Sequence, residues 1–164
     1  MVNKIGQGID FHRLEVGFPL VVGGVSIPFP RGSKGHSDGD VLYHALVDAL
    51  LGALSLGDIG QLFPSNDNRW KNANSKIFLQ HILPMIEQNG YSINNIDATI
   101  ILQEPHLSPY ISKMKINLSK IINISRENIS IKATTTDYMG FIGRGEGIAA
   151  LSLVSLFKMH ENNN

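Results

Sequence analysis

The alternation of apolar and polar residues predicts several β-strands along the chain. KIGQGIDFH (residues 4–12) has a strand pattern, and its glycines would let another backbone or a ligand come close. PLVVGGVSIP (19–28) predicts a hairpin of two short strands around Gly23 and Gly24. Strands are also predicted in YSINNIDATIILQ (91–103), ISIKATTTD (129–137) and GIAALSLVSLF (147–157), although a buried helix would give the last pattern too.

Apolar residues at helical spacing predict three helices. The first runs from Val41 to about Leu54, with Ser37 as its N-cap and Asp40 as the acidic partner of a capping box. The second runs from Ser75 to Asn89 around Pro84, and the third lies in HLSPYISKMKINLSKIIN (106–123). The segment between the first two helices (56–75) is rich in turn-forming residues. These elements predict an α+β fold: a mixed sheet of four strands with helices packed on one face.

Composition narrows the class of protein. A chain of 164 residues suits one catalytic domain over residues 1–164, with a frayed tail at 159–164. Its net charge of zero argues against a nucleic acid or an anionic membrane as partner. The absence of cysteine excludes disulfides, thiolate metal sites and a cysteine nucleophile. No apolar run reaches the roughly 18 residues of a membrane span, so we expect a soluble, cytoplasmic protein.

One group of residues has the chemistry of a metal site. Asp10 and His12 are two apart on a predicted strand, so they point to the same side. With His44 they offer one carboxylate and two imidazoles, a set that suits zinc and leaves a fourth position open. A core histidine beside a turn-capping aspartate is the alternative. Asp48, one helical turn after His44, would either orient its imidazole or lie in solvent.

Two further segments carry polar groups suited to phosphate. KGHSDGD (34–40) places His36 and Ser37 at the start of a predicted helix, where phosphate is favoured, although simple capping also explains Ser37 and Asp40. KATTTDYMGFIGRGEG (132–147) follows its strand with hydroxyls and Asp137, which suit a magnesium–phosphate group. It lacks the spacing of a Walker loop or a dinucleotide fingerprint.

Together, GIDFH, GHSDGDVLYHALVDALLGALSLGDIGQLFP, KATTT and GFIGRGEGIA resemble the 2-C-methyl-D-erythritol 2,4-cyclodiphosphate synthases of the non-mevalonate isoprenoid pathway. The resemblance extends from about residue 4 to residue 158. It implies a homotrimer with active sites at subunit interfaces, and zinc or another divalent transition metal held by Asp10, His12 and His44. It also implies magnesium or manganese bound with the substrate diphosphate, for which Asp137 is the candidate ligand.

The resemblance also implies roles for further residues. His36 and Ser37 would bind a phosphate, and His36 and Thr135 would assist catalysis. The methylerythritol group would contact Asp58, Ile59, Gly60, Phe63, Pro64, Ser65, Asn66 and Asp67. The cytidine nucleotide would contact Leu102, Gln103, Glu104, Pro105, His106, Leu107, Ser108, Thr134, Thr135 and Thr136, with Phe141 and Arg144 at further binding positions. Arg144 and Glu146 match residues of a central channel that binds isoprenoid diphosphates in some members.

Two positions depart from the family pattern. Asp137 stands where the family usually has glutamate, so a bridging water would have to span the extra distance to magnesium. His106 stands where the nucleotide loop usually has lysine. The positive charge at this position would therefore depend on whether the histidine is protonated, whereas a lysine would always carry it.

The implied reaction is an intramolecular phosphoryl transfer. In 4-diphosphocytidyl-2-C-methyl-D-erythritol 2-phosphate, the 2-phosphate attacks the β-phosphorus, a cyclic diphosphate closes and CMP leaves. Since the substrate carries its own nucleophile, the protein must mainly position it and neutralise charge. Two alternatives stay open. A zinc-dependent phosphoester hydrolase would use the same metal ligands, and a non-enzymatic trimer would bind an isoprenoid diphosphate near Arg144 and Glu146.

Overall fold

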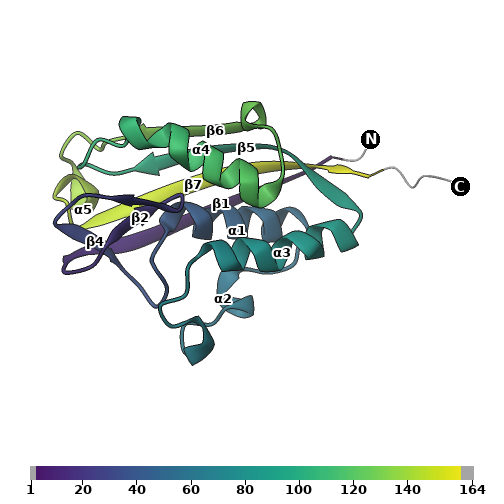
Figure 1. Ribbon diagram of the computed structural model, residues 1–164, viewed down its shortest axis with the longest axis horizontal. Coiled ribbons are helices and arrows are strands. Elements are labelled where there is room, and N and C mark those ends of the chain that lie inside the picture. Colours follow the sequence, from purple (N-terminus) through teal and green to yellow (C-terminus); the bar gives the residue numbers. More distant parts are fainter. Residues whose placement is uncertain (1–2, 160–164) are drawn as a thin grey trace, which may run out of the picture.

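The computed structural model describes residues 3–159 as a five-stranded mixed sheet with a separate hairpin (Figure 1). The expected frayed tail lies outside these residues, apart from Met159. Strands β5 (Tyr91–Ile101) and β6 (Ile129–Thr134) pair in parallel, and the other neighbouring pairs in the sheet are antiparallel. The strand order in the sheet is β4 (Arg31–Lys34), β1 (Asn3–Val16), β7 (Gly147–Lys158), β5 (Tyr91–Ile101) and β6 (Ile129–Thr134). The hairpin consists of β2 (Leu20–Val22) and β3 (Val25–Ile27), as expected.

The prediction of four sheet strands was wrong by one strand. The additional strand, β4, has the sequence RGSK and pairs with the last residues of β1 at one edge of the sheet. Its polar sequence has no apolar alternation, because an edge strand can be held by backbone hydrogen bonds to one neighbour. The uncertain segment at residues 147–157 is a strand, and it is the central one of the five.

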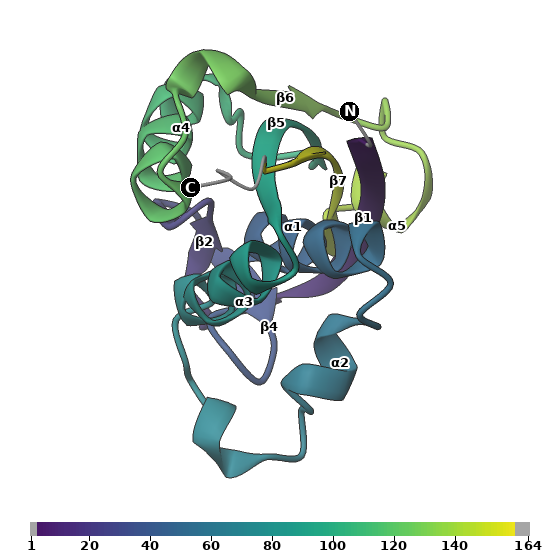
Figure 2. The ribbon, with the colours of Figure 1, turned by 90° about the vertical axis from the view of Figure 1, so that its right-hand side faces the viewer.

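Three long helices cover one face of the sheet, as predicted (Figure 2). They are α1 (Val41–Ala53), which contacts β1 and β7, α3 (Lys76–Gln88), which contacts β5, and α4 (Ser108–Ile122), which contacts β6. The short helical turns are α2 (Ile59–Leu62), η1 (Asn68–Trp70), η2 (Arg126–Asn128) and α5 (Gly140–Gly143). None of the helices in residues 3–159 combines the length and apolar character needed to cross a membrane.

The two faces of the sheet differ in what covers them. Helix α1 is buried almost throughout, and its apolar residues form the centre of the core. On the opposite face, β1 and β7 expose large apolar side chains; Ile5 is 71% exposed and Ile9 50% exposed. Phe11, Leu153 and Phe157 are also exposed. Within residues 3–159, none of the three long helices lies over this second apolar face.

The predicted N-cap of α1 was misplaced. The helix begins at Val41, and its N-cap is Asp40, whose side chain accepts a hydrogen bond from the Tyr43 N–H. The same carboxylate accepts the Gly23 and Gly24 N–H groups of the β2–β3 turn at 2.9 and 2.7 Å. Burial raises the pKa of Asp40 to about 6, although these N–H donors favour its charged form. Asp40 therefore joins the hairpin to the start of α1.

Candidate metal centre and active site

Asp10, His12 and His44 meet where β1 faces α1. One ligand atom from each of the three lies within 4.8 Å of the others. Asp10 Oδ2 lies 2.9 Å from His12 Nδ1 and 3.1 Å from His44 Nδ1. Asp10 and His12 point to the same side of β1, as their spacing predicts.

Two glycines of β1 allow α1 to approach this strand. A Cβ atom on Gly6 would lie 1.9 Å from the Ala49 carbonyl oxygen, and one on Gly8 would lie 2.0 Å from the Ala45 carbonyl oxygen. Any side chain at either position would push the helix away from the strand. The predicted close approach of a backbone to these glycines is confirmed, and it brings His44 to Asp10.

The three side chains fit a divalent transition metal. Burial alone would raise the pKa of Asp10, but hydrogen bonds from His12 and His44 outweigh it and lower this pKa to about 2. Asp10 is therefore a carboxylate at neutral pH. His12 Nδ1 is buried and faces Asp10 Oδ2. One carboxylate and two imidazoles suit zinc, and three protein ligands leave one tetrahedral position for substrate.

The other ring nitrogen of His44 contacts hydroxyls rather than Asp48. His44 Nε2 lies 2.8 Å from Ser75 Oγ and 3.1 Å from Ser37 Oγ. Asp48 Oδ1 instead accepts the Ile59 N–H at 2.7 Å. The hypothesis that Asp48 orients the imidazole was therefore wrong, and so was the solvated alternative, because Asp48 fixes the start of α2. Helical spacing located Asp48 near His44 but could not show the competing N–H donor.

A pocket of about 220 Å³ opens beside the metal cluster. It brings together residues that were predicted from different segments: His12, His36, Ser37, His44, Ile59, Gly60, Phe63 and Ser65. Sequence reasoning missed two aromatic residues in its wall, Trp70 and Phe78. Trp70 packs edge-on against Phe63 with ring centroids 5.1 Å apart. The isolated tryptophan in a polar loop was the signal that could have located this wall.

His36 and Ser37 line the pocket but do not lie at the start of α1. Three residues separate Ser37 from Val41, and the carboxylate of Asp40 occupies the helix N-terminus. The argument that this terminus attracts phosphate was therefore wrong. His36 Nε2 instead lies 3.0 Å from the Asp67 carbonyl oxygen. This contact holds the 35–40 loop against the loop that carries the other predicted binding residues.

The residues expected to bind the nucleotide form a second group. The Leu102 N–H donates to the Thr134 carbonyl oxygen at 3.0 Å, and the Tyr138 N–H donates to Gln103 Oε1 at 3.0 Å. These bonds hold the loop of residues 102–108 beside the loop that follows β6. Leu102, Gln103 and Leu107 are buried. Neither loop contributes to the described lining of the pocket beside the metal cluster.

Asp137 lies in a tight turn at the end of this second group. Its backbone φ is +50°, and Tyr138 follows with a φ of +63°. The Thr135 hydroxyl donates to Asp137 Oδ1 at 3.4 Å, and the Asp137 N–H donates back to Thr135 Oγ1 at 3.3 Å. The turn thus places a hydroxyl and a carboxylate side by side on the surface.

Arg144 and Glu146 form an exposed ion pair. Arg144 Nε donates to Glu146 Oε1 at 2.8 Å, and Arg144 Nη2 donates to Glu146 Oε2 at 3.1 Å. The hydrogen bond from Arg144 lowers the pKa of Glu146. Phe141 packs against Phe11 with ring centroids 6.2 Å apart. Both Phe141 and the ion pair therefore border the apolar face of the sheet.

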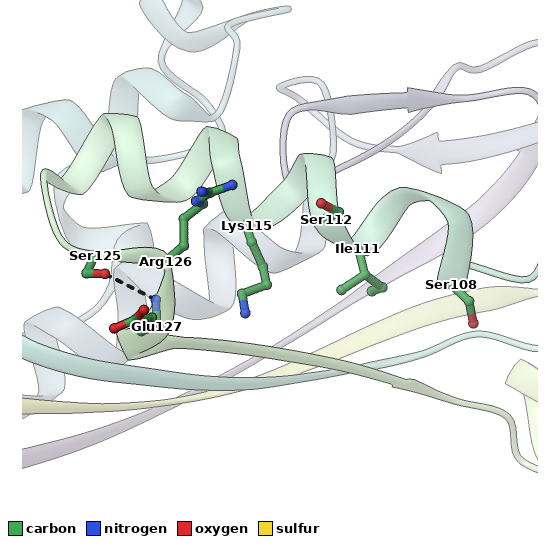
Figure 3. A pocket seen from close by; sticks show the side chains of 7 residues that line it. All are labelled: Ser108, Ile111, Ser112, Lys115, Ser125, Arg126 and Glu127. Carbon is green, nitrogen blue, oxygen red and sulfur yellow. Dashed lines mark hydrogen bonds between the residues drawn. The ribbon is translucent and has the colours of Figure 1, made fainter.

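A larger hollow of about 590 Å³ lies between α4 and η2 (Figure 3). Its wall contains the cations of Lys115 and Arg126, the carboxylate of Glu127 and several serine hydroxyls. The Glu127 N–H donates to Ser125 Oγ, as Figure 3 shows. Ser108, one of the predicted nucleotide-binding residues, also lines this hollow. The histidines of the metal cluster and the apolar wall line the smaller pocket. We therefore take the smaller pocket as the candidate active site.

Comparison with known proteins shows the family of the chain. The model of the YgbB family matches residues 3–157 of the chain. The chain belongs to the YgbB family. A member from Carboxydothermus hydrogenoformans, named 2-C-methyl-D-erythritol 2,4-cyclodiphosphate synthase, is 51% identical over 162 residues, which cover 99% of both chains. A member from Clostridium kluyveri with the same name is 52% identical over 154 residues, 94% of both chains.

Solved structures of YgbB family members share the fold. A Plasmodium falciparum protein in complex with CDP has a TM-score of 0.85 at 36% identity, and the match covers 96% of this chain and 97% of that one. The bifunctional protein IspDF from Campylobacter jejuni has a TM-score of 0.92 at 42% identity over 98% of this chain. This chain spans 43% of that longer protein.

Proposed function

We propose that this YgbB family enzyme converts 4-diphosphocytidyl-2-C-methyl-D-erythritol 2-phosphate into 2-C-methyl-D-erythritol 2,4-cyclodiphosphate and CMP. The observation that carries the proposal is the cluster of Asp10, His12 and His44 beside a pocket lined by Ser37 and Ile59. It supplies metal ligands beside a cavity, which suits a substrate that carries its own nucleophile. Synthase names among the relatives support the same reaction.

Asp10, His12 and His44 would hold zinc or a similar divalent ion. When bound, such an ion supplies Lewis-acid polarisation of a phosphate oxygen. His12 and His44 also line the pocket, so a substrate would reach the ion from there. Asp10 is ionised at neutral pH and balances half of the charge of a divalent ion. Asp137 and Thr135, on the second group of residues, would contact the magnesium that accompanies the diphosphate.

Ser37 and His36 would orient a phosphate at the mouth of the pocket. Because a carbonyl oxygen only accepts hydrogen bonds, the contact with Asp67 requires a proton on His36 Nε2. With Nε2 bound to this carbonyl oxygen, Nδ1 would be the ring nitrogen left to face a phosphate in the pocket. Phe63 and Trp70 form an apolar wall that would hold the methyl group of the substrate and exclude water.

The nucleotide would bind to the loops of residues 102–108 and 134–136, which stand apart from the metal cluster on one chain. A second copy of the chain would join the two groups. The exposed apolar face of β1 and β7, with Ile5, Ile9 and Phe11, is the surface that such a copy would cover. We propose a homotrimer with active sites between subunits, and with the Arg144–Glu146 pairs near its axis as a site for an isoprenoid diphosphate.

The test is to incubate the purified protein with the diphosphocytidyl substrate, zinc and magnesium and to follow the products by phosphorus NMR. We expect equal amounts of CMP and cyclic diphosphate. An open-chain phosphate product would indicate a hydrolase, and no turnover would favour the non-enzymatic trimer. His44→Ala should lose zinc and activity while it stays folded. His81→Ala, which removes an exposed imidazole on α3 that packs against Phe63, is the matched control for zinc binding and should keep the metal.

A further inference from the structure

Ser75 and Asp38 form a buried hydrogen-bond network behind His44. Ser75 is fully buried at the start of α3, and its Oγ lies 2.8 Å from His44 Nε2. The Ser75 hydroxyl also forms a short hydrogen bond with Asp38 Oδ1, and the Ser75 N–H donates to Asp38 Oδ2 at 3.2 Å. None of these contacts was predicted, because Ser75 and Asp38 are 37 residues apart in the sequence.

The proton positions in this network follow from the donors and acceptors. The Ser75 hydroxyl donates to Asp38 Oδ1, because a carboxylate oxygen accepts hydrogen bonds. Ser75 Oγ then has only lone pairs left for His44, and Nε2 must be the donor. A metal ion bound at Nδ1 would take over the contact of this nitrogen with Asp10 and leave the single proton of a neutral imidazole on Nε2. Nδ1 is the nitrogen that lies 3.1 Å from Asp10 Oδ2 in the metal cluster.

We infer that Ser75 and Asp38 are positioning residues for the metal ligand: Asp38 makes Ser75 an acceptor, and Ser75 holds His44 with its Nδ1 lone pair toward the metal. This inference rests on the proposed metal site. A metal-bound histidine commonly donates its second N–H to a carboxylate or carbonyl. Here a serine stands between the imidazole and the carboxylate.

Ser37 does not replace Ser75 in this role. Its hydroxyl is farther from His44 Nε2, at 3.1 Å, and it also accepts the Gly39 N–H at 3.3 Å. With the Nε2 proton directed to Ser75, the Ser37 hydroxyl keeps its own proton. That proton can point to Ser75 Oγ at 3.3 Å or toward a phosphate in the pocket. Ser75 would therefore position the metal ligand His44, while the Ser37 hydroxyl would stay free to bind a phosphate.

Two measurements on the full chain test the inference. In the zinc-loaded protein, nitrogen-15 NMR of the histidine rings should show that His44 carries its proton on Nε2 and binds metal through Nδ1. Zinc affinity, measured by competition with a chromophoric chelator, should fall roughly 10- to 100-fold in Ser75→Ala. Ser152→Ala, the matched control, removes another fully buried hydroxyl, which has no hydrogen-bond partner among the described residues, and should leave zinc affinity unchanged.

A second variant removes the carboxylate and keeps the Ser75 hydroxyl. In Asp38→Asn an NH2 group replaces one of the two oxygens that accept from Ser75, so one Ser75 donor would face another donor, and zinc affinity should again fall. A proton on His44 Nδ1, or wild-type zinc affinity in Ser75→Ala, would overturn the inference. If Ser75→Ala does not fold, the NMR measurement on the unsubstituted chain still tests the inference, because it locates the His44 proton directly. Failure to form CMP in a protein with the expected His44 spectrum would overturn the proposed function alone.

Discussion

Gly8→Ala should both destabilise the chain and weaken its metal site. The added Cβ would lie 2.0 Å from the Ala45 carbonyl oxygen and 2.6 Å from the Ala49 nitrogen. Cβ atoms in proteins keep at least 3.0 Å from such atoms, so α1 and β1 must separate by about 1 Å. Overpacking of this kind costs about 1–3 kcal/mol of unfolding free energy.

The same displacement acts on His44, because this residue lies on α1 while Asp10 and His12 lie on β1. Metal–ligand distances tolerate only about 0.2 Å of variation. A shift of about 1 Å between the two elements should therefore lower zinc affinity more than the loss of stability alone would suggest. Urea unfolding followed by circular dichroism measures the stability, and chelator competition measures the affinity.

Gly52→Ala is the matched control for this experiment. Gly52 is an exposed residue of α1, and a Cβ there would lie 3.7 Å from the Gln7 carbonyl oxygen, an ordinary contact. Alanine should stabilise the helix by up to about 1 kcal/mol and leave zinc affinity unchanged. If Gly8→Ala were as stable as the wild type with the same zinc affinity, the packing argument for the metal site would be refuted.

Further predictions concern a carboxyl group, an aromatic wall and a surface. The pKa of folded Asp40, about 6, exceeds its unfolded value near 4, so the stability from its neutral form is full below about pH 4 and is lost as pH rises through 6. The unfolding free energy of the wild type minus that of Asp40→Asn should fall by roughly 2–3 kcal/mol from pH 4 to 7; a rise would contradict this. The substrate, but not CMP alone, should change the fluorescence of Trp70, the only tryptophan. Ile9→Asp should give monomers in sedimentation velocity, and an unchanged trimer would exclude β1 as the contact surface.

The strands and helices that carry most of the core were predictable, because their apolar periodicity reflects burial. The strand β4 was not, since its sequence RGSK is held by backbone bonds to β1 rather than by apolar side chains. The N-cap of α1 was misplaced for a related reason. Ser37 and Asp40 are both good N-caps, and the choice between them depends on the β2–β3 turn, whose N–H groups bind Asp40.

The metal cluster was predictable because strand spacing fixes the directions of Asp10 and His12. The surroundings of His44 were not, because a helix face has several neighbours and hydrogen bonds select among them. Asp48 is on the expected face but is bound to Ile59. Ser75 has no sequence signal beyond its place at the start of a helix, and only the packing of α3 on α1 brings it to His44.

The separation of the metal cluster from the nucleotide loops has a genetic consequence in the proposed trimer. A defect in His44 and a defect in the loop of residues 134–136 would damage opposite sides of each interface. Two inactive alleles of these kinds, expressed together, should complement one another, because each mixed trimer contains an interface built from the two intact sides. Whether a cell has activity would then depend on which pairs of chains meet at an interface. The effect of a mutation in one allele could not be judged from that chain alone.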